Sequence, residues 1–99
     1  MGHRQVSIKE SAADSIAEIA WFIESKGLIA TADKFTDDVY DHFIKLSDSR
    51  RTHTVCREPL RAMMGYKCLS YKKKYTIVFI ETIEELIICE FLVSKNIHW

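Results

Sequence analysis

The chain has 99 residues, of which 47% are hydrophobic and 28% charged, and its 14 Lys and Arg balance 14 Asp and Glu. This length is too short for two ordinary hydrophobic cores, so we expect one domain over residues 1–99. With three Gly and one Pro, the composition excludes a low-complexity or disordered chain. A net charge of zero argues neither for nor against an anionic partner.

The hydropathy pattern bears on location. No stretch reaches the roughly 20 apolar residues of a membrane span. Residues 1–9 also lack the apolar run that a secretory signal requires. We therefore expect a cytoplasmic protein with no membrane partner.

Three cysteines, Cys56, Cys68 and Cys89, are odd in number and widely spaced. They lack the paired spacing of zinc sites, and Cys readily behaves as a small hydrophobe, so we expect free, mostly buried thiols. The four histidines are equally dispersed. These residues therefore predict no metal site, and we expect no cofactor.

The N-terminal part of the chain predicts a strand and then a helix. Val6 and Ile8 alternate with polar residues, which indicates a short strand over residues 4–9. Ser11 followed by Asp14 resembles a capping box, so we expect the helix to begin near Ser11. Its apolar residues recur at helical spacing and predict one buried face, formed by Ile16, Ile19, Ala20 and Ile23 and widened by Trp21 and Phe22.

Gly27 is the left-handed residue that we expect to end this helix. A second helix is predicted over residues 31–46, where one face is apolar and consists of Ala32, Phe35, Val39, Phe43 and Leu46. Two helices joined by a few residues form an antiparallel hairpin. Residues 47–60 then lose all periodicity around Pro59 and predict a loop or irregular segment.

The C-terminal part of the chain predicts strands. Three runs rich in aromatic and β-branched residues alternate with a period of two, over residues 66–71, 75–81 and 86–93. Short polar stretches separate them, as expected for a three-stranded antiparallel meander. Together with the first strand and the helical hairpin, this meander predicts an α+β fold with one sheet.

The charges are segregated along the chain. Residues 1–48 carry five basic and nine acidic side chains, and residues 75–99 carry one basic and four acidic ones. Residues 49–74 carry eight basic side chains and only Glu58 as an acid. Such a block attracts phosphates or an acidic protein segment where it folds onto one face, although charge runs also occur simply as solvated surface.

In this order of elements the sequence resembles the RelE/ParE superfamily of bacterial toxins over nearly its whole length. The segments that carry the resemblance are residues 11–14 (SAAD), 19–23 (IAWFI), 59–61 (PLR), 65–67 (GYK), 74–79 (KYTIVF) and 86–89 (LIIC). The resemblance implies the toxin component of a type II toxin–antitoxin or plasmid-stabilisation module. It implies an antitoxin partner, and either cleavage of messenger RNA on the ribosome or, in the ParE branch, inhibition of DNA gyrase.

Metal-independent cleavage of RNA through its 2′-hydroxyl requires proton-transfer groups and cations that stabilise the phosphorane. We predict Arg61, Lys67 and His98 as the catalytic residues of such an endoribonuclease, with Arg61 as a bidentate phosphate ligand. The predicted RNA-binding residues are Arg50, Arg51, Arg57, Lys72, Lys73, Lys74 and Tyr75.

Each of these residues also has a structural explanation. The two arginines at 57 and 61 are equally able to pair with acids, namely Asp37, Asp41 or Glu58. Tyr75 has the strand spacing of a core aromatic residue. His98 belongs to a terminal segment for which a frayed tail is the alternative.

The sequence departs from the family pattern in three places. Lys67 replaces the common arginine, Phe79 replaces the usual tyrosine, and Ser94 with Lys95 replaces a frequent His and Arg. We expect a toxin that acts on translation as an mRNA interferase. The alternatives are a non-enzymatic inhibitor of gyrase and a fold kept only as an antitoxin-binding module. A homodimer and a toxin–antitoxin hetero-oligomer are both compatible with them.

Overall fold

The computed structural model describes residues 4–48 and 53–97. The elements in chain order are β1 (Gln5–Ile8), α1 (Glu10–Ser25), α2 (Ile29–Leu46), α3 (Pro59–Met63), β2 (Lys67–Tyr71), β3 (Tyr75–Glu81), β4 (Glu85–Val93) and the 3₁₀ turn η1 (Ser94–Asn96). The predicted α+β order of strand, helical hairpin and meander is confirmed. The short helix α3 was not predicted, because five residues are too few to show a period.

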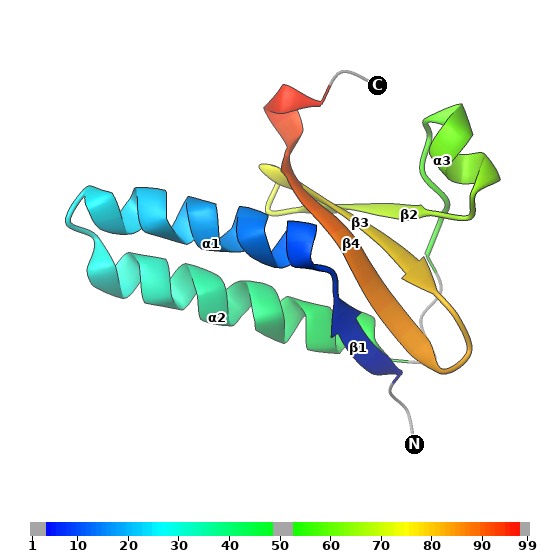
Figure 1. Cartoon of the computed structure of the whole chain (residues 1–99), viewed down its shortest axis with the longest axis horizontal. Helices are drawn as coiled ribbons and strands as arrows, with labels where there is room; N and C mark the ends of the chain where they lie inside the picture. Colours follow the sequence, from blue (N-terminus) through cyan, green and yellow to red (C-terminus); the bar gives the residue numbers. More distant parts are fainter. Residues whose placement is uncertain (1–3, 49–52, 98–99) are drawn as a thin grey trace.

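Helices α1 and α2 lie side by side as an antiparallel hairpin, and the hairpin projects well beyond the sheet (Figure 1). Gly27 joins them with a φ of +82°, the left-handed conformation that the sequence predicts, and its N–H donates to the Glu24 carbonyl at 2.8 Å. No helix within the described residues is long and apolar enough to cross a membrane.

The predicted capping box at the start of α1 is wrong. The helix begins at Glu10 after Lys9, and no side chain caps it. Ser11 instead donates a hydrogen bond from Oγ to the Cys89 carbonyl at 2.9 Å, which ties the first turn of α1 to β4. Tertiary contact with the sheet therefore replaces the local cap that the sequence suggested.

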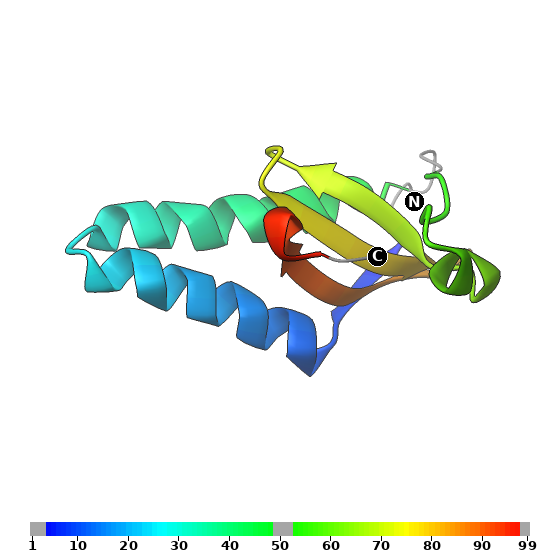
Figure 2. The same ribbon diagram turned by 90° about the horizontal axis from the view of Figure 1, so that it is seen from above.

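The four strands form one sheet in the order β1-β4-β3-β2 (Figure 2). The meander β2–β3–β4 is antiparallel, as predicted, with a register shift between Val78 and Phe79. Strand β1 instead pairs in parallel with β4, so the sheet is mixed. Parallel pairing of β1 with β4 is possible because the chain between them includes helices, whereas a tight turn joins only antiparallel strands.

The hydrophobic core lies between the hairpin and one face of the sheet. Its fully buried side chains are Ala12, Ile16, Val39, Phe43, Leu46, Ile77, Phe79, Leu86, Ile88 and Phe91. The apolar face predicted for α2 is confirmed, whereas α1 buries only its sheet-proximal end. Trp21 is 70% exposed and Phe22 is 55% exposed, so the residues predicted to widen the apolar face of α1 are not buried.

The prediction of free thiols is wrong for two of the three cysteines. Cys56 and Cys68 form a disulfide that joins the segment before α3 to strand β2. Cys89 is the free, buried thiol of the described residues. The sequence does not predict this disulfide, because an odd number of dispersed cysteines does not indicate that Cys56 and Cys68 lie close together in the fold.

Candidate functional site

The face of the sheet turned away from the hairpin, here called the open face, carries polar groups. Since Ile77 and Phe91 point into the core, their strand neighbours Thr76 and Glu90 point to the open face. Cys68 and Ser70 on β2 join this face through their pairing with β3. The segment 53–58 runs along the β2 edge, where Val55 bridges Lys67, and its residues Arg57 and Glu58 border the open face.

Arg61 reaches this face from α3 and is held by two carboxylates. Glu58 is the N-cap of α3 and accepts hydrogen bonds from the backbone N–H groups of Leu60 (2.7 Å) and Arg61 (3.3 Å). The Arg61 guanidinium lies 3.0 Å from the Glu58 carboxylate and 3.6 Å from that of Glu90 on β4. The Leu60 amide, with the Arg61 side chain, lowers the pKa of Glu58 below its ordinary range. The positive charge of Arg61 is therefore already matched by two carboxylates.

Arg57 is the exposed cation of the open face. It lines a groove of about 570 Å³, here called the open-face groove, together with Thr54, Cys68, Ser70, Thr76 and Ser94. Thr76 and Ser94 share a hydrogen bond of 2.8 Å between their hydroxyls. This groove offers the Arg57 guanidinium and several hydroxyls, a combination that binds an anion. The Glu58 carboxylate also lines the groove, but it is already bonded to the Leu60 amide and to Arg61.

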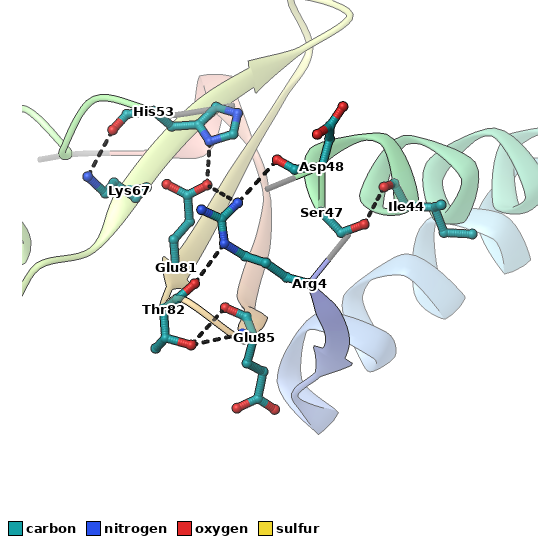
Figure 3. Close-up of polar contacts among 9 residues, drawn as sticks. All are labelled: Arg4, Ile44, Ser47, Asp48, His53, Lys67, Glu81, Thr82 and Glu85. Carbon is teal, nitrogen blue, oxygen red and sulfur yellow. Dashed lines mark hydrogen bonds and ion pairs between the residues drawn. The ribbon is translucent and has the colours of Figure 1, made fainter. Parts of the chain in front are cut away.

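Lys67 lies on the opposite side of the sheet. It pairs with Phe79, whose ring is in the core beneath the helices, so the two side chains share the helix-covered face. The Lys67 Nζ donates to the His53 carbonyl at 2.8 Å (Figure 3). The sequence predicts Lys67 and Arg61 as catalytic residues of one endoribonuclease, whereas the structure places them on different faces of the sheet.

A network of half-buried polar side chains lies beside Lys67 (Figure 3). The Glu81 carboxylate is 2.7 Å from His53 Nδ1 and 3.6 Å from the Arg4 guanidinium. Arg4 also donates from Nε to the Thr82 carbonyl at 2.7 Å. Because these groups bond one another and backbone carbonyls, they fasten β1, the segment after residue 52 and the β3–β4 turn together.

The lysines predicted to bind RNA at residues 72–74 form the β2–β3 turn. Lys72 and Lys73 adopt φ values of 53° and 63°, a left-handed conformation that non-glycine residues adopt at a cost. Lys72 Nζ lies 3.5 Å from the Asp38 carboxylate on α2. Lys73 and Lys74 line a second groove, so the turn points its cations to two sites.

This second groove, here called the α1 groove, has a volume of about 680 Å³ and lies between α1, the β2–β3 turn and η1. Its apolar side chains are Ile19, Phe22 and Val93, and its cations are Lys73, Lys74 and Lys95. Glu18 is the one acid that lines it. The α1 groove thus combines an apolar wall with a positive rim.

Tyr75, predicted to bind RNA, is half-buried in an aromatic cluster. Its ring stacks on Phe91 with centroids 5.0 Å apart and lies 5.6 Å from Phe35 on α2. Only part of the side chain reaches the α1 groove. Tyr75 therefore packs as a core residue, the structural explanation that the strand spacing also offered.

The remaining predicted residues, Arg50, Arg51 and His98, lie outside the described residues. Among the described residues, the predicted cations are divided between the open face (Arg57, Arg61), the helix-covered face (Lys67) and the β2–β3 turn. No group of three or more His, Cys, Asp or Glu side chains in 4–48 and 53–97 is placed to hold a metal ion. The sequence does not indicate Glu90 as a partner of Arg61. The role of Glu58 was recognisable, because a residue directly before Pro59 has the position of an N-cap.

A chain in the solved structure titled "Chromosomal ParDE TA system from P. aeruginosa" has the same fold, with a TM-score of 0.73. The match covers 92% of this chain and 96% of that chain at 14% sequence identity. At this identity the likeness shows the fold alone, and the α+β architecture expected from the sequence is confirmed. No protein-family model and no curated protein matches the sequence.

Proposed function

We propose that the chain is the cytoplasmic toxin of a type II toxin–antitoxin module, that an antitoxin protein neutralises it, and that it acts by binding a target protein. The observation that carries this proposal is the fold shared over 92% of the chain with a component of a ParDE system. The sequence resemblance names DNA gyrase as the target of the ParE branch. One domain over residues 1–99 carries the activity.

The distribution of cations supports binding over cleavage. General acid–base catalysis needs a proton-transfer group within hydrogen-bond reach of the reacting atoms, beside cations that stabilise the developing charge. Arg61 is balanced by Glu58 and Glu90, and Lys67 lies on the other face of the sheet. Cleavage of messenger RNA stays a second candidate, favoured by one observation, the exposed Arg57 in the open-face groove.

The α1 groove suits the antitoxin. Ile19, Phe22 and Val93 form an apolar wall that can bury the apolar side of a bound peptide segment. The lysines at the rim of the groove attract acidic residues of the same segment. An amphipathic, acidic segment therefore has the complementary chemistry. A toxin–antitoxin hetero-oligomer is the assembly that this groove supports.

Two assays run side by side test the mode of action. Purified protein is added to a gyrase supercoiling reaction and to a translating extract whose messenger RNA is mapped by primer extension. We expect inhibition of supercoiling and no new messenger RNA ends, and Arg61→Ala should change neither result by more than a few-fold if it stays folded. New ends that disappear with Arg61→Ala, without gyrase inhibition, would establish cleavage instead.

A further inference from the structure

The Cys56–Cys68 disulfide crosses from the segment 53–58 to strand β2. Its two cysteine residues differ in exposure. Cys56 is 2% exposed, whereas Cys68 is half-buried and lines the open-face groove. A reagent in this groove is therefore expected to reach Cys68 before Cys56.

Several weaker contacts hold the same segment to the sheet. The Cys56 N–H donates to the Tyr66 carbonyl at 2.9 Å, and Val55 forms a bridge with Lys67. Lys67 in turn donates to the His53 carbonyl. Each of these contacts is weaker than the covalent link, so we expect the segment to loosen when the disulfide opens, while the sheet and the hairpin stay folded.

We propose that Cys68 is a redox modification site at which a dithiol reductant opens the disulfide, and that opening frees the segment that carries Arg57 beside the open-face groove. Disulfides in reducing compartments are mostly transient or redox-sensing. The biological role of this reduction rests on the cytoplasmic location proposed above. The reduction itself is tested on purified protein, independently of toxicity.

The reaction is a balanced thiol–disulfide exchange. A reductant thiolate attacks Cys68 Sγ, an intermolecular S–S bond forms, and the Cys56 sulfur leaves as a thiolate that takes up a proton. The second thiol of the reductant then attacks its own sulfur in this mixed disulfide. Cys68 is released as a thiol, and the reductant, which has given up two electrons, becomes a cyclic disulfide.

Cys89 is the internal control for this chemistry. It is buried, and burial raises its pKa, so its thiol stays protonated and unreactive. Cys89→Ser should leave the redox behaviour of the Cys56–Cys68 pair unchanged.

The accessible sulfur is identified with single-cysteine variants and glutathione disulfide as the probe. In Cys56→Ser the groove-lining Cys68 should form a mixed disulfide at least tenfold faster than Cys56 does in Cys68→Ser, as followed by mass spectrometry on folded protein. Equal rates, or faster reaction at Cys56, would overturn the assignment of Cys68.

The structural consequence is measured by amide hydrogen exchange of the whole chain, oxidised or reduced with dithiothreitol. Residues 53–58 should exchange at least tenfold faster after reduction, residues 29–46 of α2 should not change, and the double Cys56→Ser, Cys68→Ser variant should match the reduced protein in both buffers. Unchanged exchange at 53–58, unfolding of the whole chain on reduction, or failure of the disulfide to form in oxidising buffer would each refute the proposal.

Discussion

Ile16 is more deeply buried than the other residues predicted for the apolar face of α1. Ile16 is 1% exposed in the core, and Ile19, one turn further, is only half-buried and lines the α1 groove. We expect Ile16→Ala to lower the free energy of unfolding by about 2–4 kcal/mol, because it removes buried methyl groups and leaves a cavity. Urea unfolding followed by circular dichroism measures this loss.

The control is Trp21→Ala, which truncates a larger side chain that is 70% exposed. It should change stability by no more than about 0.5 kcal/mol. If Trp21→Ala proved the more destabilising of the two, the assignment of buried and exposed ends of α1 would be wrong.

Residue spacing identifies a helix and its apolar side, but not how far along that side the sheet reaches. Ile16 and Trp21 belong to the same predicted face, yet only Ile16 is buried. Cys56 and Cys68 illustrate the same limit for long-range contacts. Their meeting depends on the path of the segment before α3, and no local pattern in the sequence records that path.

At the scale of an element, α3 depends on its cap. Glu58 accepts from the Leu60 and Arg61 amides, which lowers its pKa below the ordinary value of 4.5. A carboxyl with a lowered folded pKa stabilises the fold above its ordinary pKa and loses this contribution as the pH falls through the folded value. We therefore expect α3 to fray in acid only below the ordinary pKa.

The Leu60 amide resonance, followed by NMR during an acid titration, reports this cap. Its midpoint should lie below 4.5, and in Glu58→Gln, which keeps an acceptor oxygen but no ionisable group, this transition should vanish. A midpoint at or above 4.5 in the wild-type protein would show that the carboxylate does not cap α3.

The β2–β3 turn supports a prediction that links stability to binding. Lys73 has a φ of 63°, which costs an L-residue roughly 1–2 kcal/mol, and its side chain lines the α1 groove. Lys73→Gly should therefore stabilise the chain by about 0.5–1 kcal/mol, since glycine adopts this conformation freely but has the more flexible unfolded state. The same change should weaken capture of an acidic partner, because it removes one cation of the rim.

Lys74→Gly is the matched control, because Lys74 lines the same groove and is not among the residues with positive φ. It should remove a cation without the gain in stability. Thermal unfolding of both variants provides the comparison, and destabilisation by Lys73→Gly would mean that the turn is not strained at this residue.

At the scale of the whole molecule, the order of elements was predictable and the convergence of side chains was not. The change from helical to strand periodicity near residue 60 is local information, and it correctly predicted the hairpin and the meander. The basic block spans 26 residues and suggests a single site in the sequence. In the structure, its described side chains are divided between the two faces of the sheet and the β2–β3 turn. Lys67 and Arg61 are six residues apart, yet they lie on opposite faces of the sheet.

The separation of the basic side chains onto different faces of the sheet affects which function the fold can support. A single nuclease centre would need cations and a proton-transfer group on one face, whereas binding needs only complementary surfaces. The α1 groove and the open-face groove are such surfaces. The fold therefore has two separate grooves, which the proposed function assigns to a neutralising partner and to a target.

The central claim, that this chain is a toxin, is tested most directly by growth. The protein is expressed from a tightly controlled promoter in bacteria, alone or together with the product of the reading frame beside its gene. We predict growth arrest in the first case and normal growth in the second, with Ile16→Asp as an unfolded control that has no effect. Growth equal to an empty vector, in cells that contain soluble protein with the circular dichroism of a folded chain, would contradict the account.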